Sequence, residues 1–253
     1  MPALLLFLFA LVLRVLFVVA TPDGGACWHV GFQGDAPVWQ DLAARLAHGV
    51  QDPETMLPWR PPGMPFFVSL LTNGDGTSLH VVRWLFVALG AAIPAVLWLL
   101  LRTVVAPRIA FVASLLCAAS TNLLLLSSGL HVETPYLLGV LLVLFDQRRL
   151  GADARPLVVA RWGLANGLLC LLRAEHVLVV GAFLALAVFV GMRWRGLAIA
   201  LLGFAIPIVP WQLHANAQVA AWNGGEPVLP PAALPWDGDA IGALRALPSF
   251  QQV

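Results

Sequence analysis

The chain has 253 residues, of which 60% are hydrophobic and only 11% are charged, and its mean hydropathy is +0.87. This apolar share exceeds that of soluble globular domains and predicts an integral membrane protein. The formal net charge of +1 excludes the strongly basic surface that nucleic-acid binding requires, so we expect no nucleic-acid partner.

Residues 1–21 predict a first transmembrane helix. The run is apolar except for Arg14 and has about the 20 residues that a bilayer core requires. A cleaved signal peptide is the alternative, but it would place positive charge before the apolar run, whereas Arg14 lies inside it. Arg14 either snorkels towards an interface or faces the interior of a bundle, and we favour snorkelling.

Residues 22–78 are predicted to form a loop outside the lipid with two interfacial helices. Over residues 35–48, apolar side chains recur at three- and four-residue steps, as in an amphipathic helix lying in the interface. The turn sequence Trp59-Arg60-Pro61-Pro62-Gly63 then leads into a second short apolar helix over 64–71. This segment holds much of the charge of the chain, so we expect chemistry here.

The following apolar runs predict a helix bundle over residues 79–210. The spans are expected at residues 79–101, 109–127, 134–145, 157–172, 177–190 and 197–210. With the first helix, the chain is therefore predicted to be all-α and polytopic, with about seven transmembrane helices. Residues 211–253 are polar and contain Pro and Gly, which predicts an extracytoplasmic tail.

The arginines predict the orientation of these helices. Alternate loops carry Arg102, Arg108, Arg148, Arg149, Arg155, Arg161, Arg193 and Arg195. The positive-inside rule assigns these loops to the cytoplasm. The opposite side then gathers the 22–78 loop, the turns at 128–133 and 173–176, and the tail. The ionisable residues that are not cytoplasmic anchors are thus expected to meet on one side of the membrane.

Three of these residues have a structural explanation as well as a functional one. Asp35 suits the N-cap of the amphipathic helix, because Asp is favoured at that position. Arg60 and Arg83 suit anchors at the lipid headgroups. Both interpretations stay open for each residue.

The residues of the two outer turns point more strongly to function. Glu133 lies in a short apolar turn near membrane depth, where an ionisable group indicates a functional site, although a capping role is also open. Arg173 and Glu175 either act on a ligand or pair with each other. The histidines and the three cysteines show no metal-ligand spacing, so a divalent metal ion bound by carboxylates is only a weak prediction.

An ordered set of residues carries a family resemblance. It comprises one membrane helix, the acidic start of the interfacial helix in Gly34-Asp35-Ala36-Pro37, Arg60-Pro61-Pro62-Gly63, Glu133, and Leu172-Arg173-Ala174-Glu175. This order resembles the GT-C glycosyltransferases, and more narrowly glycosyltransferase family 39, the protein mannosyltransferase and aminoarabinose transferase group. The resemblance runs from the N-terminus to about residue 225.

The resemblance implies transfer of a sugar from a polyprenyl-phosphate donor to a glycan, lipid or protein acceptor, outside the inner (plasma) membrane. By position, Asp35 matches the catalytic acidic residue of the family and Glu133 its second acidic position. Arg173 matches the arginine before the next helix, and Arg60 matches the loop element beside the active site.

The chain departs from the family at two positions and in its length. Ala36 stands where a second acidic residue is common, and His214 stands where an arginine is common. Family members usually continue with further membrane helices, so the chain is expected to correspond to the N-terminal part of a GT-C fold, either as a truncated reading frame or as a divergent short member.

Glycosyl transfer also needs these residue types for chemical reasons. The reaction passes through an oxocarbenium-like state and needs a carboxylate to take the proton of the acceptor, which predicts Asp35 as the general base. Glu133 would orient the acceptor or raise the basicity of Asp35. The arginines expected to bind the donor phosphate are Arg173, Arg60 and Arg83. The residues expected to position the acceptor or the loop are Glu175, His131 and Trp59.

Two other classes of protein stay open. A small lipid or solute transporter would have broken helices and ionisable residues near the middle of its spans, and Pro94 is the one clear break in the sequence. A non-catalytic membrane subunit would use the outer loop to hold a partner.

Overall fold

The computed structural model describes residues 1–20, 39, 42–44, 46, 61–71 and 79–222. Its helices are α1 (Pro2–Ala20), α4 (Gly63–Ser69), α5 (Leu79–Leu101), α6 (Pro107–Ala118), α7 (Thr121–Ser128), α8 (Glu133–Gln147), α9 (Pro156–Leu172), α10 (His176–Phe189) and α11 (Trp194–Trp222). No strand occurs in these ranges, which confirms the all-α prediction for them. Within the predicted helix 35–48, the described residues 39, 42–44 and 46 are helical.

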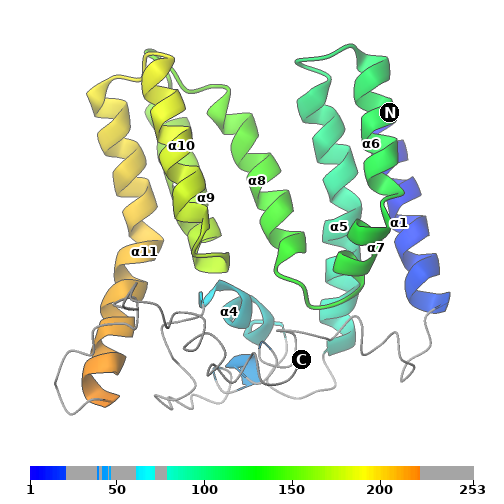
Figure 1. Cartoon of the computed structure of the whole chain (residues 1–253), viewed down its shortest axis with the longest axis horizontal. Helices are drawn as coiled ribbons and strands as arrows, with labels where there is room; N and C mark the ends of the chain where they lie inside the picture. Colours follow the sequence, from blue (N-terminus) through cyan, green and yellow to red (C-terminus); the bar gives the residue numbers. More distant parts are fainter. Residues whose placement is uncertain (21–38, 40–41, 45, 47–60, 72–78, 223–253) are drawn as a thin grey trace, which may run out of the picture.

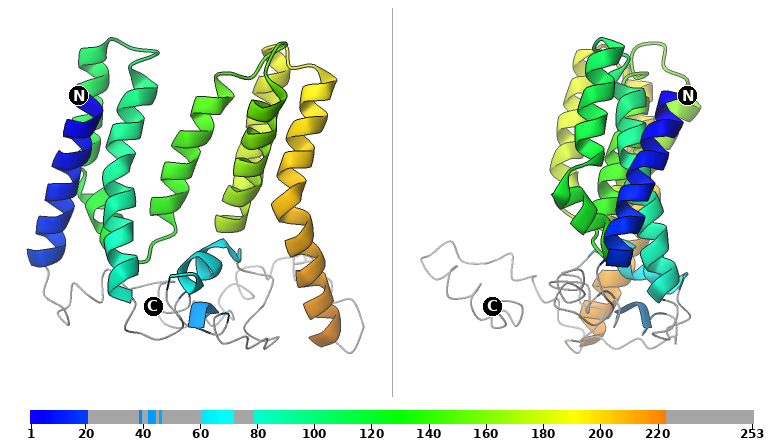
Figure 2. Two further views of the ribbon diagram at one scale, coloured as in Figure 1. Left: turned by 180° about the vertical axis from the view of Figure 1, so that it is seen from behind. Right: turned by 90° about the vertical axis from the view of Figure 1, so that its right-hand side faces the viewer.

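The long helices stand side by side and end at two opposite faces (Figures 1 and 2). One face carries the turns from α5 to α6, from α8 to α9 and from α10 to α11 (Figure 1). The other face carries α4, the turn before α8 and the turn from α9 to α10. The arginine-rich turns therefore lie at one end of the bundle, and Glu133 and Arg173 lie at the other, as the alternation of the loops predicts.

Three described helices are long and apolar enough to cross a membrane. They are Pro2–Ala20, Val81–Leu101 and Trp194–Ala217, with mean hydropathies of 2.9, 2.3 and 1.8. The pair α6 and α7 would together make a fourth span, and α9 and α10 are shorter apolar helices. Large apolar side chains that point outward include Leu4, Val12, Leu16, Leu178, Phe189 and Leu202. Such long apolar helices with apolar outer surfaces are those of a membrane protein.

Two helices differ from the predicted spans. The single span predicted over 109–127 is two helices, α6 and α7, bent by 54° at a break after Ala118. Ser120 has an extended backbone there, and the side chains of Ser, Thr and Asn favour helix caps over helix interiors. Helix α11 continues to Trp222 instead of ending near residue 210. Pro207 and Pro210 lie inside it, and Gln212 Nε2 donates to Asn216 Oδ1 at 3.0 Å in the continuation.

The snorkelling interpretation of Arg14 is wrong. Its side chain is 1% exposed, and Nε donates to Ser127 Oγ at 2.8 Å. Nη1 donates to the carbonyl oxygens of Ala10, at 3.1 Å, and Ala118, at 3.5 Å. The guanidinium has room because Gly90 of α5 faces it: a Cβ on Gly90 would lie 2.9 Å from Arg14 Nε. Arg14 therefore faces the bundle interior, beside the break between α6 and α7.

Helices α9 and α11 pack backbone to backbone through glycine. A Cβ on Gly163 would lie 2.1 Å from the carbonyl oxygen of Ala200, and one on Gly167 would lie 2.6 Å from that of Phe204. From the other side, a Cβ on Gly203 would lie 2.5 Å from the carbonyl oxygen of Ala160. Small residues four apart allow this close approach of membrane helices. The contact fixes α9, whose C-terminal end carries Arg173.

Candidate functional site

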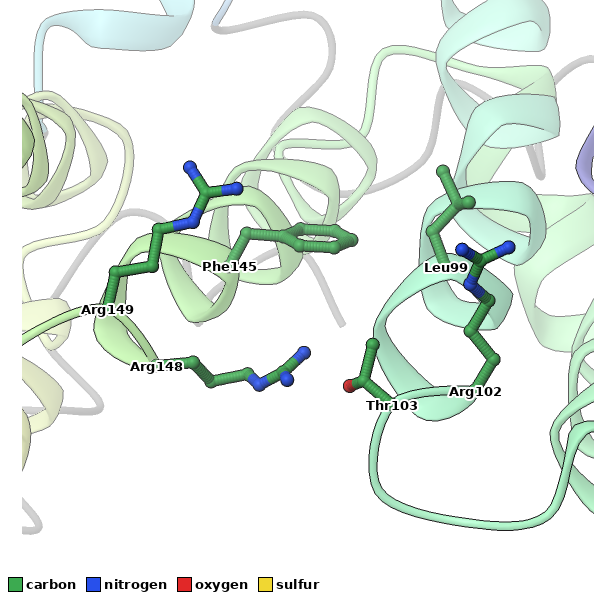
Figure 3. Close-up of a pocket in the computed structure, with 6 residues that line it drawn as sticks. All are labelled: Leu99, Arg102, Thr103, Phe145, Arg148 and Arg149. Carbon is green, nitrogen blue, oxygen red and sulfur yellow. The ribbon is translucent and has the colours of Figure 1, made fainter.

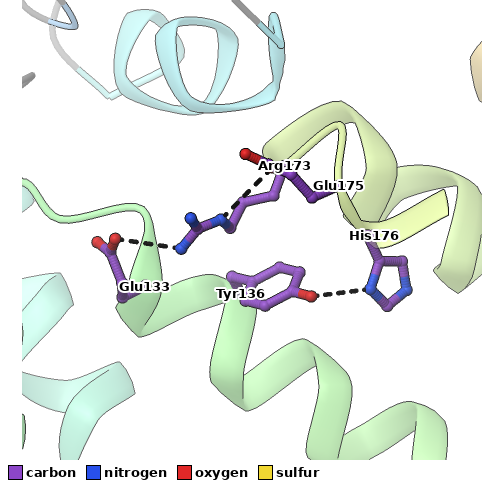
Figure 4. A network of polar contacts seen from close by, with 5 residues as sticks. All are labelled: Glu133, Tyr136, Arg173, Glu175 and His176. Carbon is purple, nitrogen blue, oxygen red and sulfur yellow. Dashed lines mark hydrogen bonds and ion pairs between the residues drawn. The ribbon is translucent and has the colours of Figure 1, made fainter. Parts of the chain in front are cut away.

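Arg173 lies at the centre of a polar cluster formed by the starts of α8 and α10 and the end of α9 (Figure 4). Its Nη1 donates to Glu133 Oε1 at 3.2 Å, and its Nε lies 3.8 Å from Glu175 Oε2. The side chains of Arg173 and Glu133 are 37% and 40% exposed, and that of Glu175 is 74% exposed. Ion pairs this exposed contribute only about 0–1 kcal/mol each. The guanidinium is thus held in place by partners that a stronger anion can displace.

The chain geometry explains why these three residues meet. Helix α9 ends at Leu172, and Arg173 turns the chain with extended backbone angles of φ −143° and ψ 115°. The backbone N–H of His176 donates to the carbonyl oxygen of Arg173 at 3.0 Å, which closes a tight turn into α10. Glu133 starts α8 and Glu175 is the N-cap of α10, positions at which the helix dipole favours negative charge. The predicted pairing of Arg173 with Glu175 is therefore present, and Glu133 is added to it.

A chain of hydrogen bonds connects the ring next to Arg173 with the core of the bundle. Its members are Tyr136 on α8, His176 on α10 and Asn166 on α9, and the last two are fully buried. The hydroxyl of Tyr136 lies 3.0 Å from His176 Nδ1, and His176 Nε2 lies 3.0 Å from Asn166 Oδ1. The ring of Tyr136 in turn lies under the guanidinium of Arg173, whose Cζ is 5.6 Å from the ring centroid. This is a cation–π contact, and it links the exposed cation to the core.

The direction of these hydrogen bonds follows from Asn166. Its Nδ2 donates to the carbonyl oxygen of Trp162 at 2.8 Å, so its Oδ1 is the acceptor that faces His176. His176 Nε2 therefore carries a hydrogen. Full burial favours the neutral ring, in which Nδ1 accepts from the hydroxyl of Tyr136. The hydrogen bond from its hydroxyl to His176 therefore holds the ring of Tyr136 in place.

Tyr136, Asn166 and the burial of His176 were not predicted from the sequence. Two signals were available. Tyr136 is the only tyrosine of the chain and lies three residues after Glu133, on the same side of a helix. Asn166 is a polar residue in the middle of a predicted apolar span, where such residues have a structural or functional role.

Arg83 and the turn before α8 form a second polar group at this end. Arg83 is buried, and its Nε donates to the carbonyl oxygen of Ser128 at 3.1 Å. Thr134 Oγ1 donates to the carbonyl oxygen of Leu126 at 2.8 Å. Together these bonds tie α5 and α8 to the end of α7, which leads into the turn that contains His131. Within the described contacts, Arg83 supports this turn.

The described part of the 22–78 loop packs over the same end. A Cβ on Gly63 would lie 2.5 Å from the carbonyl oxygen of Leu171, two residues before Arg173. Met64 and Val68 of α4 are buried in an apolar cluster that includes Trp39 and Leu130. The predicted site residues Asp35, Trp59 and Arg60 lie outside the described residues.

The described carboxylates do not fit a metal site. No group of three His, Cys, Asp or Glu side chains that could hold a metal ion occurs in the described ranges. Glu133 and Glu175 both face the guanidinium of Arg173, whose positive charge opposes a cation there.

No family model, curated protein or solved structure matches the chain. The family resemblance of the sequence thus stays a prediction. The side chains of the cluster can bind an anion at Arg173, and they present two carboxylates beside it.

We predict that His131 titrates below its ordinary range and that Glu133 limits the shift. Burial lowers the pKa of His131, and the nearby Glu133 carboxylate raises it in part. In Glu133→Gln the raising contribution is lost, so the pKa of His131 should fall further. The measurement is an NMR titration of histidine-labelled protein in detergent. Glu175→Gln is the control and should leave His131 unchanged; an equal effect of both variants would contradict this electrostatic assignment.

Proposed function

We propose that the chain is a membrane glycosyltransferase with about seven transmembrane helices. It moves a sugar from a polyprenyl-phosphate donor to an acceptor hydroxyl on the extracytoplasmic side of the plasma membrane. The observation that carries the proposal is the state of Arg173: its guanidinium is oriented by Tyr136 and held by two exposed carboxylates. A cation of this kind, at the end of an apolar bundle, suits a phosphate whose lipid tail stays in the membrane.

In this proposal, Arg173 binds the donor phosphate and stabilises it as the leaving group. The planar guanidinium offers two parallel N–H donors to two phosphate oxygens. The bond between the anomeric carbon and the phosphate oxygen breaks, and its electron pair goes to the lipid phosphate. Arg173 then neutralises the charge that develops on that oxygen.

In this proposal the carboxylates activate and orient the acceptor. Asp35 takes the proton of the acceptor hydroxyl as its oxygen bonds to the anomeric carbon. Glu133, once released from Arg173 by the phosphate, orients the acceptor. Arg60 precedes Gly63 by three residues, a reach of at most about 11 Å, and Gly63 lies against Leu171 at the end of α9. That reach supports Arg60 as a second phosphate contact.

The test is transfer from radiolabelled polyprenyl-phosphate sugars in membranes that contain this chain. A panel of donors is compared for the wild type and Asp35→Asn. We expect transfer from one donor class by the wild type, and its loss in Asp35→Asn with the protein still inserted. Absence of transfer by the wild type with every donor would reject the proposal and favour a non-catalytic membrane subunit.

The break between α6 and α7 favours a second candidate function, movement of an anionic lipid or solute across the membrane. Transporters combine broken helices with ionisable groups at mid-membrane depth. Here Arg14 is buried beside the break and donates to Ala118 at the end of α6. Its Nη2 is buried and has no hydrogen-bond partner within the described part of the chain, so an anion that reaches it would gain a charge-assisted hydrogen bond.

Arg14→Met separates the two candidates, because methionine keeps an unbranched side chain and removes the charge. A transporter should lose uptake in this variant. A glycosyltransferase that uses Arg173 should keep its transfer activity. Reconstituted vesicles loaded with acceptor allow both activities to be followed in one sample.

A further inference from the structure

A cavity of about 330 Å³ lies at the end of the bundle opposite to Arg173. Its lining residues are Leu99, Arg102, Thr103, Phe145, Arg148 and Arg149 (Figure 3). They come from the C-terminal end of α5 and the C-terminal end of α8 with the residues that follow each helix. Two separate helices therefore bring three guanidiniums to one hollow.

The three guanidiniums have no carboxylate partner among the described residues. The nearest carboxylate along the chain, Asp146, is bound by Arg161, whose Nε donates to Asp146 Oδ2 at 2.7 Å. A second bond joins Arg161 Nη2 to Asp146 Oδ1. Asp146 is therefore already paired and does not form an ion pair with Arg148 or Arg149. Three like charges around one cavity repel each other, and a bound anion would relieve that repulsion.

The placement of the arginines around the cavity suits a phosphate group. Arg148 extends across it towards Thr103, while Arg102 rises from the end of α5 (Figure 3). Arg102 is also held by its contact with Trp98, whose ring centroid lies 4.9 Å from Cζ. Guanidiniums from two sides can each offer paired N–H donors to phosphate oxygens.

The walls of the cavity suit a ligand at a membrane boundary. Leu99 and Phe145 provide the apolar part of its wall. Nearby in the chain, Val104 and Leu142 are exposed apolar side chains. Basic pockets between membrane helices at the cytoplasmic side are typical sites for anionic headgroups. The volume is at the lower end of that of ligand sites, which fits a headgroup better than a whole lipid.

We propose that this cavity binds a phosphate group, carried by an anionic lipid headgroup or free in solution. The ligand sits between Arg102 and the Arg148–Arg149 pair and joins the ends of α5 and α8. The site is independent of the chemistry at Arg173, because it lies at the other end of the helices and shares no residue with that cluster.

The test compares two triple variants with equal loss of charge. R102A/R148A/R149A removes the cavity arginines, and R155A/R193A/R195A removes three arginines of the same end that do not line it. Native mass spectrometry in detergent counts bound dioctanoyl phosphatidylglycerol, with dioctanoyl phosphatidylcholine as the neutral lipid. We expect binding of the anionic lipid to weaken at least about tenfold in the cavity variant only.

A competition arm identifies the source of the phosphate. Pyrophosphate that displaces the anionic lipid at equal concentration assigns the site to free phosphate, whereas retention of the lipid at equal concentration assigns it to a headgroup. R102K/R148K/R149K keeps charge and fold and should bind more weakly than the wild type, because lysine lacks the paired donors. Equal losses in the two alanine triples, or wild type that binds neither probe, would overturn the proposal.

Discussion

Arg173→Ala is expected to lower the affinity for polyprenyl phosphate about a hundredfold and to abolish sugar transfer. Loss of charge-assisted hydrogen bonds worth about 3 kcal/mol accounts for that factor. The affinity of Arg173→Lys should lie between those of the wild type and Arg173→Ala. Lysine keeps the charge but offers no paired donors and no planar face to the ring of Tyr136. Glu133→Gln should not reproduce the loss of affinity for polyprenyl phosphate, since Glu133 competes with the phosphate for the same guanidinium.

The only tyrosine of the chain makes the binding measurable at the site itself. The guanidinium of Arg173 lies over the ring of Tyr136. Incorporation of 3-fluorotyrosine at this position therefore gives one ¹⁹F resonance that responds when Arg173 changes partner. Titration with polyprenyl phosphate should move this resonance in the wild type and leave it fixed in Arg173→Ala. Arg193→Ala, at the opposite end of the bundle, is the control and should bind as the wild type does. Unchanged affinity in Arg173→Ala would remove Arg173 from the donor site.

The sequence predicted the features that depend on composition and alternation. Apolar runs locate most helices, and the arginines of alternate loops predict that Glu133 and Arg173 lie at the same end. The contact between them, with 40 residues of separation, fits that prediction. A pattern of loops determines on which side of a membrane a residue lies, but not what it touches there.

The features that the sequence did not predict depend on contacts between distant segments. Arg14 is buried because Gly90 leaves space for it and Ser127 accepts its hydrogen bond, 113 residues away. No local pattern around Arg14 contains that information. Tyr136 and His176 are 40 residues apart, and their bond exists only because α8, α9 and α10 meet. The acidic residue on which the proposed reaction depends, Asp35, lies outside the described residues, so its role rests on sequence alone.

Gly163→Val is expected to cost about 3 kcal/mol of stability. The new Cβ would lie 2.1 Å from the carbonyl oxygen of Ala200, and a backbone atom has no alternative rotamer. Helix α9 would have to move away from α11. Thermal unfolding in detergent, followed by far-ultraviolet circular dichroism, measures the loss. Gly181→Val on α10 is the matched control, because its Cβ meets nothing within 4 Å and it introduces the same β-branched side chain.

The same variant tests whether the packing of α9 positions the site. Asn166 lies between Gly163 and Gly167 and bonds His176, which in turn orients Tyr136 under Arg173. Displacement of α9 should therefore change the ¹⁹F resonance of Tyr136 and weaken the binding of polyprenyl phosphate, although Gly163 contacts neither Tyr136 nor the proposed ligand. If Gly163→Val lost stability but kept both the resonance and the affinity of the wild type, the orientation of Arg173 would not depend on the buried chain. Equal destabilisation by Gly181→Val would instead show that the cost comes from valine in a helix and not from the contact with α11.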